Sequence, residues 1–288
     1  MFGFITEHRS EFGVKEMCRV LGVTRSWYYK FSGRGETRRQ RSDRELLPRI
    51  KAFFEGSDKT YGAVRIGKDL QEEGTHVGKH RIRRLMREND LKVKTTKRFK
   101  VTTNSDHKRP IAPNLVNQEF TAEAPDRLWT GDITYIWTSE GWLYLAVVLD
   151  VFSRRIVGWS MNRRMTDELV VAAFKNALVR RRPTQGFIFH TDRGSQYCSK
   201  RFRALVKGVG GVQSMSATGC CYDNAITESF FGTLKRELVH HCSFITRQGA
   251  QSRIFRYIEG FYNRKRRHSA IGYLSPEQFE QGRFKMAA

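Results

Sequence analysis

After Pro125 the sequence changes from helical periodicity to a strand-rich pattern, and this change constrains the fold more than any other feature. Three alternating segments, "RLWTGDITYIWTS", "GWLYLAVVLDVF" and "RRIVGWSM", are joined by short turns. A helix capped by Thr166 or Asp167, the strand "GFIFHTD", the short helix "SKRFRALVKG", the strand "GVQSMSA" and a last helix follow. The order βββαβαβα predicts an α/β domain: a mixed sheet of about five strands flanked by helices on both sides.

The last helix, "CYDNAITESFFGTLKREL" (residues 220–237), carries a carboxylate between an amide and a lysine. Steps of four and seven residues return to nearly the same direction, so Asn224, Glu228 and Lys235 are expected within about 40° of one another. A separate apolar side is formed by Ile226, Phe230, Leu234 and Leu238. Taken alone, the pattern fits a solvated face with one charge pair.

Acids are scarce in this part of the chain, and three of them are well placed to meet. Asp132 lies within the first strand, Asp192 ends the fourth strand, and Glu228 lies on the last helix. If the first and fourth strands are neighbours, both aspartates project at the same part of the sheet. Converging carboxylates repel one another without a cation and suit Mg²⁺ or Mn²⁺, two ions per site, for in-line phosphoryl displacement.

Two other readings of these acids stay open. Each acid singly could form a salt bridge, since arginine is plentiful in the domain. Asp150 also ends the second strand, and it either approaches the same site or pairs with Arg154 or Arg155.

The net charge of the chain indicates its partner. The 288 residues contain 52 Lys and Arg against 29 Asp and Glu, a formal charge of +23. Such a surplus favours a polyanionic partner, with nucleic acid ahead of an anionic membrane. The longest apolar run is too short to span a bilayer, and no secretory signal opens the chain, so a cytoplasmic protein is expected. Five cysteines without a framework spacing agree with that and predict no zinc site.

The first 110 residues are the denser in positive charge and contain two passages that resemble helix-turn-helix motifs. In "VKEMCRVLGVTRSWYYKF", the small Cys18 lies inside the first helix, Gly22 gives the turn and Thr24 caps a second helix. Arg25 at the start of that second helix is a predicted DNA contact. An ordinary helical hairpin is the alternative.

The second passage, residues 61–92, ends one helix at Gly74 and continues with "GKHRIRRLMREN". This basic helix has an apolar stripe of Ile82, Leu85 and Met86. Its cations are predicted to lie against DNA phosphates; they are Lys79, Arg81, Arg83, Arg84 and Arg87.

Proline-rich and basic stretches separate these parts. "GRGETRRQR" is interpreted as a flexible joint, and residues 93–125 as a basic linker that tracks a DNA backbone. The predicted domains are two helix-turn-helix domains, the linker, the catalytic core and a C-terminal helical tail, at residues 1–45, 46–105, 106–125, 126–240 and 241–288.

Four segments resemble a known family: "GDITYIWTSEGWLYLAVVLDVFSRRIVGW", "FHTDRGSQY", "CYDNAITESFFGTLKREL" and "YNRKRRHSAIGYLSPEQF". They are similar to the OrfB transposases of bacterial insertion sequences, in the retroviral-integrase superfamily. The resemblance implies a ribonuclease-H-like fold and a catalytic triad with 35 residues between its last two members. The 35 residues between Asp192 and Glu228 match that spacing.

Carried over to this sequence, the resemblance implies that Asp132, Asp192 and Glu228 are the metal ligands and catalytic residues. It implies that Lys235 contacts the DNA of the element end. Further residues are expected to line the site or contact DNA, with stabilisation of the loop or closure of the core as the alternative: Asn224, His190, Arg193, Gln196, Tyr262, Asn263, Arg264, Arg267 and His268.

The predicted function is therefore a DNA transposase that cleaves element ends and joins the freed 3′-OH to another strand. A simple nuclease of the same fold and a non-catalytic DNA-binding regulator are the alternatives. The resemblance implies a homo-oligomer on double-stranded DNA, associated with the bacterial nucleoid. It also implies an OrfA-type protein as a partner or as a fused segment, since OrfB products begin close to the position that Met1 has in this sequence. The zinc module of retroviral integrases has no counterpart in the sequence.

Overall fold

The computed structural model describes residues 1–33, 36–94, 110–217 and 224–287, with side chains described as far as residue 282. The chain divides into two compact units, Met1–Lys92 and Val93–Ala288. No helix in the described ranges has the length and apolar character needed to cross a membrane.

The first three helices form a small cluster with its own core. They are α1 (Phe2–Glu7), α2 (Val14–Val20) and α3 (Arg25–Ser32). The backbone N–H of Trp27 donates to the Thr24 hydroxyl at 3.3 Å, and Gly22 has φ +66° in the turn. Both features confirm the predicted turn at Gly22 and the predicted cap at Thr24. The core of the cluster consists of Ile5, Met17, Cys18 and Tyr28.

A second group of three helices follows: α4 (Arg38–Gly56), α5 (Ala63–Glu72) and α6 (Lys79–Glu88). Thr37 and Gln40 form a capping box that starts α4, so the joint expected over residues 33–41 is wrong from Arg38 onward. The boundary expected between residues 45 and 46 also falls inside this helix. Buried residues of all three helices provide the apolar positions of the group: Leu46, Ile50, Phe54, Ile66, Leu70, Ile82, Leu85 and Met86.

The second unit contains a five-stranded sheet in the order β3-β2-β1-β4-β5. The strands are β1 (Leu128–Thr138), β2 (Gly141–Asp150), β3 (Ile156–Asn162), β4 (Ile188–Thr191) and β5 (Val212–Met215). β1 is antiparallel to β2 and parallel to β4, and β4 is parallel to β5. The mixed sheet and the adjacency of the first and fourth strands, on which the predicted site depends, are confirmed.

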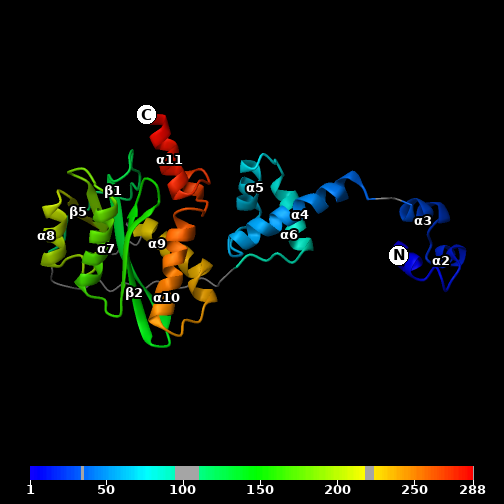
Figure 1. Ribbon diagram of the computed structural model, residues 1–288, viewed down its shortest axis with the longest axis horizontal. Coiled ribbons are helices and arrows are strands. Elements are labelled where there is room, and N and C mark those ends of the chain that lie inside the picture. Colours follow the sequence, from blue (N-terminus) through cyan, green and yellow to red (C-terminus); the bar gives the residue numbers. More distant parts are fainter. Residues whose placement is uncertain (34–35, 95–109, 218–223, 288) are drawn as a thin grey trace. The chain divides into compact units, whose positions relative to one another are not determined.

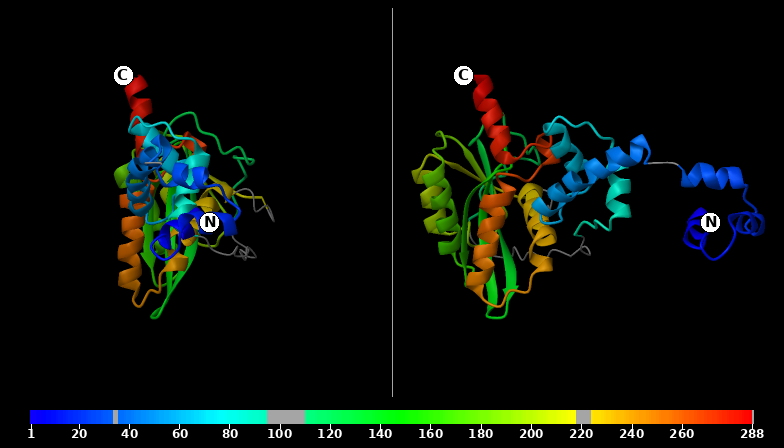
Figure 2. Two further views of the ribbon diagram at one scale, coloured as in Figure 1. Left: turned by 90° about the vertical axis from the view of Figure 1, so that its right-hand side faces the viewer. Right: turned by 45° about the vertical axis from the view of Figure 1, so that its right-hand side comes forward.

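Helices cover both faces of this sheet, as Figures 1 and 2 show. On one face, α7 (Asp167–Arg180) and α8 (Lys200–Gly208) pack over a core that includes Trp129, Phe174 and Phe202. On the other face, α9 (Ala225–Glu237) and α10 (Arg247–Phe255) cover a second core that includes Leu149 and Phe230. The predicted apolar side of α9 is buried in that second core.

The C-terminal segment belongs to the sheet unit, and its expected separation as a tail from residue 241 is wrong. Ile254 of α10 and Ile258 of the following π-helical turn (Arg256–Tyr262) are fully buried in the second core. The amide of Asn263 bonds both the N–H and the C=O of Ile156 in β3, at 2.9 and 3.0 Å. The remaining elements are the short turns Val239–His241 and Ser269–Ile271 and the helix α11 (Pro276–Ala287).

Part of the expected linker also packs on the sheet. Residues 95–109 lie outside the described residues, but the chain from Pro110 onward docks against β5. The N–H of Leu115 donates to Ser214 Oγ at 2.9 Å, and Met215 N donates to the Pro113 carbonyl at 3.3 Å. Val116 is buried in the second core. These residues therefore brace the sheet and do not form a free linker.

Candidate active site

Asp132 projects from β1 toward the face that α9 covers. Its register partner on β2 is Val147, which belongs to the core under α9 and α10. Partners in an antiparallel pair share a face, so Asp132 lies on the α9 side. The backbone N–H of Ile133 donates to Asp132 Oδ1 at 2.7 Å and orients the carboxylate.

A buried hydrogen bond holds the start of α9 against the same strand. Thr227 Oγ1 donates to Thr130 Oγ1 at 2.8 Å, and both side chains are fully buried. Thr130 lies two residues before Asp132, on the same face of β1. Glu228 follows Thr227 directly, so this bond brings the first turn of α9, with Glu228, to the Asp132 part of the sheet.

Asp192 follows the end of β4, the parallel neighbour of β1. The N–H of Gly194 donates to Asp192 Oδ1 at 2.9 Å. A Cβ at Gly194 would stand 2.9 Å from that same oxygen, so a side chain there would displace the carboxylate. Tyr197 is buried in the core on the α7 side, and its burial, followed by the charges of Asp132 and Asp192, raises its pKa and keeps the phenol neutral.

The three carboxylates act on one another electrostatically. Burial, and then the charge of Asp192, raises the pKa of Asp132 well above its usual range, and the charge of Glu228 adds to the rise. Burial and Asp192 likewise raise the pKa of Glu228. The structure therefore brings together the three acids that the sequence singled out, and their mutual repulsion favours the arrival of positive charge.

Lys235 provides one cation at this site. Burial lowers its pKa, while the charge of Asp132 acts in the opposite direction. Its Nζ lies over the ring of Tyr135, 5.1 Å from the centroid. Glu228 and Lys235 thus lie on the flank of α9 that faces the strand carrying Asp132, as the helical spacing predicted.

The donor set suits a hard divalent cation that keeps other ligands. Within the described residues, no three His, Cys, Asp or Glu side chains form a ready-made metal cage. Mg²⁺ is usually held by one or two carboxylates with water and substrate phosphates, so it does not need such a cage. Mutually repelling carboxylates with raised pKa values therefore fit the ion better than they fit a set of salt bridges.

Three residues that were expected to face DNA are buried within the protein. Asn224 is only 4% exposed at the start of α9, and His190 is fully buried with Nδ1 2.8 Å from Ser214 Oγ. Arg267 is 6% exposed and donates to the Tyr273 carbonyl. Direct DNA contact by these three residues in this conformation is therefore wrong, because their side chains do not reach the surface.

Two further residues of the "HTDRGSQY" segment stabilise the loop, which was the alternative reading for them. Arg193 Nε donates to the Ser216 carbonyl at 2.6 Å, and Gln196 Nε2 donates to the Met165 carbonyl at 3.1 Å. Tyr262, Asn263 and His268 are buried and close the core, whereas Arg264 is exposed and stays a predicted DNA contact.

The cations of the basic helix α6 fall into two groups, those paired with α4 and those exposed to solvent. Arg81 and Arg84 point toward α4, where both form ion pairs with Asp43, at 2.6 and 2.5 Å. These two residues join helices, so the sequence prediction of free phosphate contacts is wrong for them. Lys79, Arg83 and Arg87 are exposed, as is Arg25 on α3, and their DNA contacts stay predictions.

Asp150, the competing acid, lies elsewhere. It pairs in register with Trp129, whose core is on the α7 face, so it points away from Asp132. Burial, and then the charge of Asp126, raises the pKa of Asp150 to about 7. Ser153 Oγ donates to its carboxylate at 3.0 Å. Neither the approach to the triad nor an ion pair with Arg154 or Arg155 is found in the described contacts.

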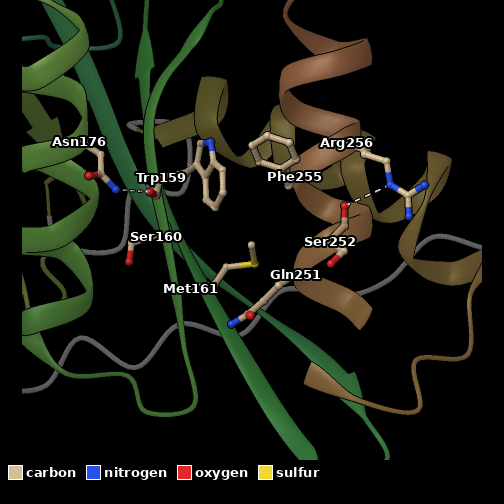
Figure 3. Close-up of a pocket in the computed structure, with 8 residues that line it drawn as sticks. All are labelled: Trp159, Ser160, Met161, Asn176, Gln251, Ser252, Phe255 and Arg256. Carbon is tan, nitrogen blue, oxygen red and sulfur yellow. Dashed lines mark hydrogen bonds between the residues drawn. The ribbon is translucent and has the colours of Figure 1, made fainter. Parts of the chain in front are cut away.

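A hollow of about 570 Å³ lies at the β3 edge, between α7 and α10, as Figure 3 shows. Its rim includes the rings of Trp159 and Phe255, 5.9 Å apart, and Asn176 donates to the Trp159 carbonyl. The residues lining it include no carboxylate. The acidic site is thus separate from this hollow.

Comparison with known proteins agrees with this arrangement. Residues 122–221 and 228–284 match the family described as "Integrase core domain", and residues 41–99 match an "HTH-like domain". The fold and the site define a protein of the integrase-core class. The transposase InsF for insertion sequence IS3A of Escherichia coli (strain K12) is 45% identical over 280 residues, covering 96% of this chain and 97% of that protein. The chain therefore belongs to the family of IS3 insertion-sequence transposases.

Other relatives extend the comparison. An uncharacterized 31 kDa protein of insertion element IS600 from Shigella sonnei is 46% identical over 272 residues, covering 94% of this chain and all of that protein. Among solved structures, the simian T-cell lymphotropic virus intasome has a TM-score of 0.48 at 15% identity, covering 80% of this chain and 74% of that chain. The HTLV-2 integrase catalytic core domain in complex with magnesium has a TM-score of 0.44 at 17% identity, covering 56% and 99%.

The family match confirms the resemblance noted in the sequence and its ribonuclease-H-like fold class. Sequence reasoning missed the residues that support the triad, Thr130, Thr227 and Tyr197. Thr130 lies one strand period before Asp132, and Thr227 is adjacent to Glu228, so their positions in the motifs were the available signal.

Proposed function

We propose that the protein is a DNA transposase whose second unit cleaves element ends and transfers the freed 3′-OH to a second DNA strand. The observation that carries this proposal is the mutual electrostatic action of Asp132, Asp192 and Glu228 in an integrase-core fold. Three oxygen-donor side chains whose negative charges repel one another favour a bound cation over an empty site.

Asp132, Asp192 and Glu228 would hold the divalent ions, with Mg²⁺ or Mn²⁺ as the metal and two ions per site. When bound, such ions supply Lewis-acid stabilisation of charge during phosphoryl transfer. The chain's own residues do the positioning: the N–H groups of Ile133 and Gly194 orient the two aspartates. Lys235 would bind a DNA phosphate beside them.

The proposal includes double-stranded DNA as substrate, bound by the exposed cations Arg25, Lys79, Arg83, Arg87 and Arg264. The net charge of +23 supports such binding, with a steep dependence on salt. Synapsis of two DNA ends requires a homo-oligomer, and an OrfA-type partner or fusion would add further DNA recognition. The site of action would be the bacterial nucleoid, in the cytoplasm.

The experiment uses labelled duplexes taken from the DNA that flanks the gene, incubated with the full chain and Mg²⁺. We expect nicks at the element end and joined products, with at least about a thousandfold loss of both in Asp192→Asn. DNA binding by Asp192→Asn should persist.

Other outcomes would replace the proposal. Nicks without joined products would indicate a nuclease of the same fold. Binding without either product, together with no effect of Asp192→Asn on transposition in cells, would indicate a DNA-binding regulator.

A further inference from the structure

Three exposed aromatic residues form a contiguous cluster on the β1–β2 hairpin. Tyr135, Trp137 and Trp142 are 48%, 60% and 43% exposed. Trp137 and Trp142 are register partners, and Tyr135 is one strand period away, so all three lie on one face. Ring centroids are 4.8 Å apart between the tryptophans and 5.1 Å apart between Tyr135 and Trp142. We refer to these three residues as the aromatic platform.

The fold does not require this platform for its core. The opposite face of the hairpin carries Ile136 and Leu143, which are buried under α10. The hairpin end extends beyond the neighbouring strands, as Figure 1 shows. Three large rings left together in solvent have an unfavourable contact with water, and such contiguous apolar surface marks a binding site.

The platform is connected to the catalytic acids through Lys235. The Nζ of Lys235 lies over the Tyr135 ring, and the same charge acts on Asp132. Tyr135 and Trp137 lie three and five residues beyond Asp132 on β1 and on the opposite face of that strand, so Lys235, beside the Tyr135 ring, is the link between the acids and the platform. A DNA strand held at the acids would therefore pass Lys235 on its way to the platform.

The charges beside the platform favour nucleic acid over a second copy of this chain. Lys235 borders one side, and Arg247 Nε donates to the Trp142 carbonyl at 3.0 Å. Glu140 accepts from the Arg247 backbone N–H and lies 4.0 Å from its guanidinium, so two cations stand against one carboxylate beside the platform. A second copy would bring the same net positive charge into the contact, where it would repel. Aromatic rings combined with cations are the usual means of binding single-stranded nucleic acid, because each base offers a flat face for stacking.

The ring geometry also fits a base. Neighbouring rings are turned by 74° and 82°, so each ring meets the next edge to face. A nucleobase can stack on one ring while its edge rests against the next. We propose that Tyr135, Trp137 and Trp142 bind unpaired nucleobases of the DNA strand a few nucleotides from the cleavage position. This inference rests on the proposed function and adds a site for opened DNA ends to it.

The test measures DNA binding by the full chain without divalent ions, using fluorescence anisotropy. The probes are one duplex with a five-nucleotide thymine overhang, the same duplex with five abasic positions in the overhang, and the blunt duplex. We expect the wild-type protein to prefer the base-bearing overhang over the abasic one by about fivefold or more. Trp137→Ala and Trp137→Leu should lose this preference, Trp137→Phe should keep most of it, and binding to the blunt duplex should be unchanged in all three.

Phe255→Ala provides the matched control, since Phe255 is 48% exposed on α10 outside the platform. It should keep the preference. The inference is overturned if Trp137→Ala keeps the preference, or if the wild-type protein shows none. It is also overturned if Trp137→Ala changes only the oligomeric state in sedimentation, which would make the platform an interface between copies.

This outcome is independent of catalysis. Because no divalent ion is present, a chain that failed to cleave or join DNA could still show a preference that depends on Trp137. That result would reject the proposed transposase activity and keep the platform.

Discussion

The second unit contains two groups of three acids, and they differ in what surrounds them. Burial and the charge of Asp192 raise the pKa values of Asp132 and Glu228, and the lysine beside them has its own pKa lowered by burial. The other group is Asp126, Asp150 and Glu280. There, Arg155 Nη1 lies 2.7 Å from Glu280, and Arg181 also forms an ion pair with Glu280.

The second group has its cations built into the chain. Arg181 directly follows α7, and Glu280 lies on α11, so their ion pair fastens the C-terminal helix to the sheet unit. The first group instead fits cations that come from solution. The comparison teaches that acids with arginine partners mark structure, whereas acids that mainly face one another mark chemistry.

The largest expected effect separates the two groups directly. Glu228→Gln should reduce strand cleavage at least about a thousandfold while leaving stability equal or higher, because it removes repulsion. Glu280→Gln should reduce the free energy of unfolding by about 3 kcal/mol and leave cleavage by the folded protein intact, since two arginines lose a buried partner. Urea unfolding and a cleavage assay on both variants provide the measurement.

The distinction between the two groups of acids would be wrong if Glu228→Gln and Glu280→Gln both lost cleavage or both lost stability. Glu277→Gln is the matched control on α11, because Glu277 is partly exposed and 3.8 Å from Arg155. It should change stability by less than about 1 kcal/mol.

The next effect concerns metal binding and pH. Because the pKa values of Asp132 and Glu228 are raised, protons compete with a divalent ion for these carboxylates. The affinity for Mg²⁺ should therefore rise with pH, and calorimetry in buffers of different ionisation enthalpy should show proton release. Binding without proton release would mean that the triad is already ionised.

A smaller effect belongs to Asp150. Its folded-state pKa of about 7 lies above the ordinary value of 3.8, so its protonated form stabilises the fold below pH 4. That contribution is lost as the pH rises through 7, by at most about 4 kcal/mol. The stability of Asp150→Asn should decrease less than that of the wild-type protein between pH 4 and 8, because the amide does not titrate. Ser153 can still form a hydrogen bond with it.

Urea unfolding at several pH values between 4 and 8 measures this difference. Glu168→Gln, a change at an exposed acid on α7, should leave the slope as in the wild-type protein. Equal slopes in Asp150→Asn and wild type would show that Asp150 does not hold a proton in the folded state.

The smallest expected effect tests the bond that holds α9. Thr227→Val should reduce stability by about 1 kcal/mol, because the Thr130 hydroxyl loses its buried partner. The double variant Thr130→Val, Thr227→Val should recover much of that stability. Cleavage should stay reduced in both variants if the bond positions Glu228, and a full return of activity in the double variant would contradict this role.

Much of the site could be predicted from the sequence because it depends on local periodicity. Strand alternation placed Asp132 inside β1, and helical spacing placed Glu228 and Lys235 on one flank of α9. The adjacency of β1 and β4 was the condition on which the predicted site depended. These features need only the backbone pattern, and the structure confirms them.

The surroundings of single side chains could not be predicted in the same way. Arg81 and Arg83 are two residues apart on one basic helix, yet Arg81 pairs with Asp43 of α4 and Arg83 is exposed. His190 reads as a site residue, but β5 places Ser214 beside it and buries it. Such outcomes depend on which element packs opposite, and residues distant in the sequence determine that.

The paired bonds between Asn263 and Ile156 have a consequence for the outer strand of the sheet. An unpaired strand edge offers its N–H and C=O groups to other chains and so promotes self-association. Asn263 occupies both groups of Ile156, and Asn176 occupies the carbonyl of Trp159, so β3 is shielded at two points. A shortened chain that ended before Asn263 would lose one of these shields, and we expect it to aggregate through β3 even with Asp132, Asp192 and Glu228 all present.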